Sequence, residues 1–315
     1  MKSCPRRCNK PVRDSNRGRV SNEEDIFRDI VGLQLYVGPT LSGYLLFVLG
    51  PLIAAILLSF THYDMMSPPR LIGFSNYARL FSDARLAVVY KNTALFAVMA
   101  VVLTVGIGTL LGIALNKRLP GFLKYILRTA YFFPVLVGMI YAAMVWKFLF
   151  NRDLGVVNYY LHFFNLPPIP WLTSTAWAIW SVILVYGWKN VGFTMLTTLA
   201  GLQNISEELY EAARIDGAKS HAVLFRIIIP LLSPVILFNM TITMINTLQE
   251  FDSIVALTNG GPGDASRTVV MYIYDKAFRS FDMGYASAIA VTLFVVISIF
   301  TVLQLWAGRR WVHHS

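Results

Sequence analysis

The sequence carries little charge and almost no cysteine. Only 14% of its 315 residues are charged, and 56% are hydrophobic, whereas an average soluble domain has roughly 25% charged residues. This deficit, together with long uncharged runs, excludes an ordinary soluble domain and indicates an integral membrane protein. The net charge of +10 does not indicate nucleic-acid binding, because much of it lies in the tail before the first apolar run, as topology signals do.

The two cysteines, Cys4 and Cys8, both lie in the polar N-terminal tail. A tetrahedral zinc site needs four ligands, and no histidine or further cysteine lies near them, so we expect tail thiols and no metal. A lipoprotein anchor is not expected, because no apolar segment precedes either cysteine. The first apolar run is too long for a signal peptide and lacks a small-residue cleavage site, so we expect it to stay in the membrane.

Sequence signatures of catalysis are also missing. The chain has no G-x-x-x-x-G-K-[ST] phosphate loop, so it cannot hold ATP by that means. It shows no nucleophile–base pair and no cluster of metal ligands. We therefore expect a protein that is not an enzyme and that binds no cofactor itself.

Six apolar runs are long enough to cross the roughly 30 Å hydrocarbon core as helices. They cover residues 35–60, 87–115, 129–150, 176–199, 232–257 and 285–306. The sequence thus predicts an all-α integral membrane protein with a tail over 1–33, a six-helix membrane domain over 34–310 and a C-terminal tail over 311–315. Interior prolines such as Pro51 and Pro134 predict kinks or local breaks.

The basic residues favour one side of the membrane. Seventeen lie in alternate segments: eight in the tail, four in the 116–128 loop, three in the 200–231 loop and two at the C-terminus. Seven lie in the remaining connecting segments. By the positive-inside rule, both termini and the 200–231 loop are predicted to be cytoplasmic.

The opposite loops carry local structure signals. Residues 71–81 have aromatics at amphipathic spacing and are expected to lie at the membrane interface. Residues 166–171 (LPPIPW) predict a rigid proline turn. Residues 259–264 (NGGPGD) predict a tight loop, in which glycines allow positive φ and the proline fixes direction.

A polar hairpin is predicted over residues 204–231, between two apolar runs. Ser206 is a good N-cap, and Glu207 and Glu208 suit the positive end of a helix. Gly217 can end that helix with a left-handed turn. An amphipathic segment follows over 218–229, and Pro230 and Pro234 mark re-entry into the membrane.

One face of the predicted hairpin helix is shallow. Leu209, Ala212 and Ala213 are expected on the same face of the helix, and the two small alanines would let another backbone approach closely. The alternative is an ordinary solvated loop helix.

The stretch Glu211–Pro230 resembles the EAA loop of binding-protein-dependent ABC importer permeases, whose pattern is EAA, three residues, G, nine residues, I-x-L-P. The chain departs from this pattern at Ile229, where the family has Leu. The fuller string ELYEAARIDGA is similar to the carbohydrate-uptake branch, the class of the maltose permeases, as are GFSNYARLF, WKNVGFTMLTTLAGLQ, LTNGGPG and YIYDKAF. The matching positions of the loop itself are Glu211, Ala212, Ala213, Gly217, Ile227 and Pro230.

This resemblance implies the type I ABC importer permease fold in an inner or plasma membrane. It implies a second homologous permease, an ATP-binding cassette ATPase dimer that uses the ATP, and an extracytoplasmic solute-binding protein. The hairpin helix would dock on the ATPase as a coupling helix. The coupling residues that it implies are Glu211, Ala212, Ala213, Asp216 and Gly217.

Polar residues in the fifth run indicate a solute path. They recur at helical spacing and so share one face. Polar groups inside a bilayer usually face the bundle interior or a wet cavity, and the alternative is hydrogen bonding between helices. These residues are Asn239, Thr243, Asn246, Glu250 and Ser253.

The fourth run adds Tyr186, Lys189 and Asn190, together with several tryptophans. Aromatic faces stack on sugars, and amides bind their hydroxyl groups, although the same aromatics could form a packing core or an interfacial belt. Lys189 lies mid-run, where we expect it to pair or face water. Its charge would also suit a phosphate-bearing solute such as a glycerol phosphate.

The chain is therefore predicted to be a permease subunit forming half of the path for a sugar or related solute. The loop residues Gly260, Gly261 and Pro262 are predicted to grip the binding protein, a simple turn being the alternative. An ion-coupled secondary transporter or channel subunit is the other class considered. It would require a chain of buried carboxylates and inverted halves, and the sequence shows neither.

Overall fold

The computed structural model describes residues 37–117 and 119–311. The predictions for the 1–33 tail, for Cys4 and Cys8, and for residues 312–315 lie outside the described residues. The chain divides into two compact units, one up to Ala55 and one from Ile56 onward, and each is described by itself.

The first described helix runs over Val37–Ser59 and contains an irregular turn. The π-helical turn η1 (Leu45–Leu49) directly precedes α2 (Gly50–Ser59), in which Pro51 is the second residue. A proline has no N–H for the carbonyl four residues back, and a π-helical turn is one way to absorb that gap. The predicted irregularity near Pro51 is therefore confirmed, although the helix is continuous.

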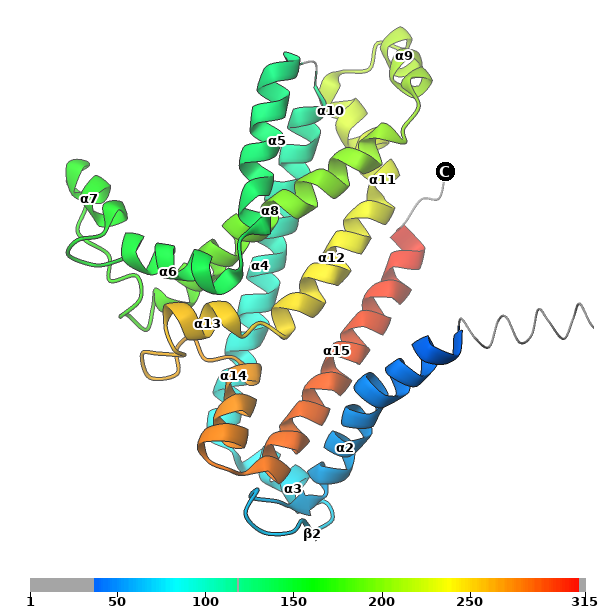
Figure 1. Cartoon of the computed structure of the whole chain (residues 1–315). Helices are drawn as coiled ribbons and strands as arrows, with labels where there is room; N and C mark the ends of the chain where they lie inside the picture. Colours follow the sequence, from blue (N-terminus) through cyan, green and yellow to red (C-terminus); the bar gives the residue numbers. More distant parts are fainter. Residues whose placement is uncertain (1–36, 118, 312–315) are drawn as a thin grey trace, which may run out of the picture. The chain divides into compact units, whose positions relative to one another are not determined.

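From Ile56 onward the described chain is mostly helical, with irregular connections between the helices (Figure 1). One short hairpin interrupts it, where β1 (Thr61–His62) pairs antiparallel with β2 (Arg70–Leu71). The long helices are α4 (Ala84–Asn116), α5 (Gly121–Leu136), α6 (Met139–Leu149), α8 (Ala178–Gln203), α12 (Ser233–Leu248) and α15 (Met283–Trp311). The short elements are α3 (Ser75–Ser82), α7 (Val156–Phe163), α9 (Glu207–Ile215), α10 (Ser220–Val223), η2 (Leu224–Ile228), α11 (Ile229–Leu231), α13 (Asp252–Leu257), α14 (Val269–Tyr274) and η3 (Asp275–Arg279). The predicted all-α fold is confirmed.

Helices α4 and α8 form the central packing contact, and Figure 1 shows them crossing with α5 beside them. A Cβ at Gly108 would lie 2.5 Å from Thr194 Cβ, and one at Gly112 would lie 2.8 Å from Thr198 Cβ. On the other side of α8, a Cβ at Gly192 would lie 2.0 Å from the backbone oxygen of Tyr131 in α5. Small residues of this kind let helix backbones approach closely in membranes.

Two apolar clusters lie along α4. In one, Phe96 of α4 meets Tyr186 of α8 edge to face, with ring centroids 5.4 Å apart. In the other, the first turns of α4 pack against α14 and α15 through Leu86, Tyr272 and Tyr285. Helix α4 thus joins the two packed regions along its length.

Three described helices are long and apolar enough to cross a membrane, namely Val37–Ser59, Ala84–Asn116 and Met283–Arg309. Two bent pairs raise this number to five if each pair is one span. Helix α8, which matches the predicted fourth span, has 26 residues, or about 39 Å at 1.5 Å per residue. It carries polar residues in its middle and falls outside that apolar set.

The predicted third span over 129–150 is not one helix. Helix α5 begins at Gly121, inside the predicted 116–128 loop, and α6 leaves it at an angle of 104°. The break at Val137 and Gly138 follows Pro134, as expected near an interior proline. Gly138 also favours a break, because glycine has a low helix propensity.

The predicted fifth span over 232–257 is also broken. Helix α12 ends at Leu248 and α13 begins at Asp252, so Glu250 lies between two helices. Its carboxylate accepts a hydrogen bond from the backbone N–H of Ser253, at 2.8 Å. This side chain competes with the backbone for the next amide donors, which is a local reason for the helix to end there.

Candidate functional site

The polar hairpin forms as the sequence predicts. Helix α9 begins at Glu207, with two acidic residues in its first turn. Gly217 has φ +69°, and the amide of Ala218 bonds the carbonyl of Ala213 at 2.9 Å. This is the hydrogen bond of a Schellman cap. A Cβ at Gly217 would meet nothing within 4 Å, so its left-handed backbone alone favours glycine.

The return segment is less regular than predicted. It begins at Ser220 with α10 and passes through the π-helical turn η2 before Pro230. A bend of 63° at Leu232 then separates it from α12. The two prolines therefore accompany re-entry, as expected.

The exposed face of α9 differs from the predicted one. Leu209 and Ala212 are open to solvent, but Ala213 is only 7% exposed and lies against the chain itself. Ile215 instead completes the open face and is 86% exposed. Successive residues point 100° apart on a helix, so Ala212 can remain on the open face while Ala213 packs inward.

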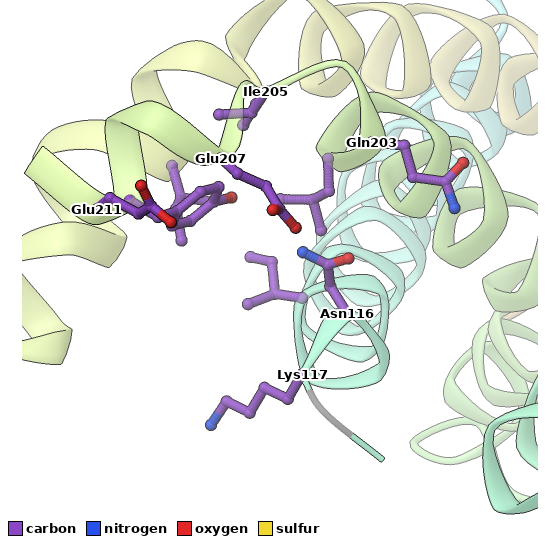
Figure 2. A pocket seen from close by; sticks show the side chains of 10 residues that line it. Asn116, Lys117, Gln203, Ile205, Glu207 and Glu211 are labelled. Atoms are coloured by element: carbon purple, nitrogen blue, oxygen red, sulfur yellow. The ribbon is translucent and has the colours of Figure 1, made fainter. Parts of the chain in front are cut away.

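A cavity of about 590 Å³ lies between α9 and the ends of α4 and α8 (Figure 2). Figure 2 shows Glu207 and Asn116 pointing toward one another across it. Glu211 and Lys117 also line it, and none of these charged side chains makes an ion pair within the described residues.

Tyr210 also faces this cavity. Its hydroxyl is buried and has no hydrogen-bond partner among the described residues. Burial raises the pKa of this hydroxyl, which keeps it protonated and able to donate. The cavity is thus lined by solvent-exposed charges without ion pairs and by one buried donor without a partner among the described residues.

The predicted polar stripe of the fifth run divides into two parts. Asn239 and Thr243 are buried, and Asn239 Oδ1 accepts a hydrogen bond from Thr197 of α8 at 2.8 Å. Asn239 therefore acts as a hydrogen-bonding group between α8 and α12, and Thr243 is buried one turn further along α12. Asn246 is exposed, and Glu250 lies in the break beyond it. Since the helix ends before Glu250, the five predicted residues do not share one helical face.

The polar residues of α8 are placed unequally. Tyr186 is buried in the core beside Phe96, whereas Lys189 and Asn190 are partly exposed. Lys189 Nζ lies 3.4 Å from the carbonyl of Val135, near the end of α5 where carbonyls lack helical partners. Trp188 is half-exposed and packs edge to face with Trp146 of α6 at 5.4 Å.

The loop over residues 259–264 is tight, as predicted. Asn259, Gly260, Gly263 and Asp264 all have positive φ. Gly260 is buried against Arg267 and Met271, while Asn259 and Gly263 are exposed. Any partner of this loop would therefore meet Asn259, Gly263 and the half-exposed Gly261 and Pro262.

A network of charges and tyrosines surrounds the first turn of α4. Asp83 caps the helix by accepting from the amides of Arg85 and Leu86, and it also accepts from the hydroxyls of Tyr272 and Tyr285, at 2.7 Å each. Five ion pairs lie in this region, joining Arg79 to Asp282, Arg85 and Arg267 to Asp264, and Arg267 and Arg279 to Asp275.

Sequence reasoning missed several of these residues. Asn116, Lys117, Gln203 and Tyr210 reach the hairpin cavity from three separate helices, so no local spacing joins them. The link from Arg85 to Asp264 spans 179 positions. The only local signal was the aspartate before Ala84, a good N-cap for a long apolar helix.

Comparison with known proteins gives a consistent result. Residues 104–313 match the family of binding-protein-dependent transport system inner membrane components. The chain is 32% identical to a probable ABC transporter permease protein, YesP, of Bacillus subtilis, over 94% of this chain and 96% of that one. It is also 32% identical to the trehalose/maltose transport system permease protein MalF of Thermococcus litoralis, over 87% of this chain and 92% of that one.

A solved structure shares the fold. It is a bacterial alginate ABC transporter in complex with an alginate pentasaccharide-bound periplasmic protein. The TM-score is 0.80 with 24% identity, covering 91% of this chain and 96% of that chain. The family match and the near full-length relatives show that this multi-pass membrane chain belongs to the inner membrane components of binding-protein-dependent transport systems, the permease subunits of ABC importers.

Proposed function

We propose that this chain forms half of the translocation path of an ATP-driven importer for a sugar or a related solute, and that α9 couples it to the ATPase. The observation that carries the proposal is the hairpin. Helix α9 presents Leu209, Ala212 and Ile215 outward, while its carboxylates line a cavity without ion pairs. An exposed apolar patch next to unpaired charge is typical of a docking surface.

The coupling residues have separate roles in this proposal. Ala212 and Asp216 lie on the open face, where the partner ATPase would contact α9. Glu211 lies at the cavity, where it can bind a basic group of the partner. Ala213 packs inward and Gly217 ends the helix, so these two set the position of α9.

The proposed solute path runs past the two helix breaks. Lys189 lies near a carbonyl freed at the end of α5, and Asn190 follows it on α8. Asn246 and Glu250 lie near the break after α12. Half-exposed Trp188 offers an aromatic face of the kind on which sugars stack. The sugar class is supported by the trehalose/maltose permease relative. The partly exposed Lys189 is the feature that favours a glycerol phosphate as the alternative solute.

Three partners complete the proposed importer: a second homologous permease, an ATPase dimer and an extracytoplasmic binding protein. The binding protein in complex with the alginate transporter supports the last of these. We propose that it docks on the tip formed by Gly261 and Pro262. The charge bias of the sequence supports cytoplasmic termini. Neither the family match nor the fold supports the ion-coupled alternative.

The test is ATP-driven uptake in proteoliposomes that contain this chain together with the second permease and the ATPase of the same importer. Glu211→Lys should lower uptake by about tenfold or more, because a charge-assisted contact is worth roughly 1.5–3 kcal/mol. Gly217→Val should do the same, because a β-branched residue is strained at positive φ.

Gly73→Val is the matched control. Gly73 has φ +61° and open space around a Cβ, as Gly217 has, but it lies outside the hairpin. It should leave uptake unchanged. Normal uptake in both hairpin variants, with the ATPase still bound, would remove α9 from the mechanism.

A further inference from the structure

The loop over residues 259–264 is fastened to the first three turns of α4. Arg85 makes two hydrogen bonds to the carboxylate of Asp264, at 2.6 and 2.9 Å. Asn92 donates to the backbone carbonyl of Asp264 at 2.7 Å and to that of Arg267 at 3.2 Å. Arg85 and Asn92 are seven positions apart, which places them two turns apart on one face of the helix.

These contacts are geometrically strong. The Arg85–Asp264 pair is bidentate, an arrangement that fixes orientation as well as distance. The Arg85 guanidinium, first among several causes, holds the pKa of Asp264 below its usual range, so this carboxylate stays charged. Just beyond the loop, the amide of Val269 donates to the buried hydroxyl of Thr93 at 2.9 Å. The end of the loop and the residues that follow it are thus tied to α4 at Asp264, Arg267 and Val269.

Helix α4 then runs without interruption to the other end of the unit. It has 33 residues, or about 50 Å at 1.5 Å per residue. Its last residue, Asn116, lines the hairpin cavity opposite Glu207. Between the two ends, Gly108 and Gly112 seat α4 closely on α8. One continuous helix therefore contacts both the loop and the hairpin region.

We propose that Arg85 and Asn92 are positioning residues that fasten the binding-protein loop to α4, so that docking of the binding protein is transmitted along α4 to the hairpin. This inference rests on the proposed function. Neither residue contacts solute or ATP. They act by making the loop and α4 move as one body, and without them the loop would shift independently of the helix.

The chain contains a matched control for Arg85. Arg79 pairs with Asp282 at 2.7 Å, and the side-chain exposures are 48% and 21%, compared with 49% and 20% for Arg85 and Asp264. Both pairs lie near the start of α4. They differ in that Asp264 belongs to the loop, whereas Asp282 precedes α15.

The first measurement tests whether Arg85 and Asn92 restrict the motion of the loop. A nitroxide is attached to Ala265→Cys, directly after the loop, in the full chain with Cys4 and Cys8 replaced by serine. Its mobility is read by electron paramagnetic resonance. Arg85→Ala and Asn92→Ala should increase the mobility of the label, and Arg79→Ala should not. Equal spectra in all of these variants would overturn the fastening.

The second measurement follows transmission in proteoliposomes containing both permeases and the ATPase. The binding protein of the same importer is supplied with glucose, maltose, lactose and trehalose as probes, and a thermal-shift assay first checks that each sugar binds to it. Arg85→Ala should reduce stimulation of ATP hydrolysis by about tenfold, as loss of a charged hydrogen-bonded contact predicts. Arg85→Lys should retain part of the stimulation, because lysine keeps the positive charge but cannot make the bidentate contact with Asp264. Basal hydrolysis should not change.

The outcomes separate the two proposals. If wild-type protein is stimulated and Arg85→Ala behaves as Arg79→Ala does, the positioning role is wrong and the importer function stands. If Arg85→Ala also lowers basal hydrolysis, its role is structural and the inference is overturned. If no loaded binding protein stimulates the wild type, the proposed function fails, and the inference fails with it.

Discussion

The two ends of α4 have opposite surroundings. At its start, all five ion pairs of the described residues gather around Arg79, Arg85, Arg267 and Arg279. At its end, Glu207, Glu211 and Lys117 line a cavity without pairing. The first region satisfies its own charges, and the second does not. The region around Asp83 pairs its charges within one chain, whereas the charges at the hairpin stay open to solvent and so to the partner ATPase that we propose.

The largest effect is expected where the two regions are joined. Gly112→Leu would place a side chain against Thr198 and the carbonyl of Met195, which lie 2.8 and 2.9 Å from its Cβ. We expect a loss of about 3 kcal/mol in the free energy of unfolding, because overpacking costs roughly 1–3 kcal/mol or more. Thermal unfolding in detergent measures it. Gly106→Leu is the control, since a Cβ there meets nothing within 4 Å. Similar Tm values for the two variants would contradict the close α4–α8 contact.

The next effect sharpens the contrast between paired and unpaired carboxylates. Asp83→Ala removes the acceptor for Tyr272, Tyr285 and the first amides of α4. We expect a loss of about 2 kcal/mol, from charged hydrogen bonds and a helix cap. Glu211→Ala, at the hairpin, should leave the Tm unchanged. An equal loss in both variants would show that the two regions do not differ.

Protonation of Asp83 at low pH should also lower the folding stability that the start of α4 contributes. Burial alone would raise the pKa of Asp83, but hydrogen bonds from Tyr285, Tyr272 and the Leu86 amide, with the charge of Lys276, hold that pKa below its ordinary value. A lowered pKa contributes stability above the unfolded value of about 3.9, and that stability is lost as pH falls through the folded pKa. The Tm should therefore fall below about pH 4, and Asp83→Asn should show a smaller fall. Parallel Tm curves for wild type and Asp83→Asn would exclude this source.

The smallest effect is expected at the edge of the same network. Arg279 pairs with Asp275 at 3.1 Å and is 53% exposed. Arg279→Ala should cost no more than about 0.5 kcal/mol, because exposed ion pairs contribute little. A loss as large as that of Asp83→Ala would mean that the whole network acts as one unit, which a double variant would reveal as non-additivity.

Sequence reasoning succeeded where the signals are local. The cap at Gly217, the acidic first turn of α9 and the tight loop at Pro262 each depend on neighbouring residues, and each is present. Apolar runs located the helices, and Pro134 predicted a break near Gly138, but no local signal revealed the break before Asp252. A broken helix keeps its apolar composition, so hydropathy cannot distinguish it from a straight span.

The rest depends on contacts between distant residues. The inward turn of Ala213, the burial of Tyr186 and the fastening of Asp264 to Arg85 are each fixed by packing against another helix. The hairpin cavity joins residues from α4, α8 and α9. Periodicity gives the face of one helix, but it does not give the element that covers that face.

The most direct test of this contrast is hydrogen–deuterium exchange of the permease pair with and without the ATPase. We expect amides of residues 207–217 to exchange more slowly when the ATPase is bound, and those of residues 79–92 and 264–282 to exchange at the same rate in both states. Unchanged exchange over 207–217, with the ATPase demonstrably bound, would contradict the proposal that the hairpin binds this partner.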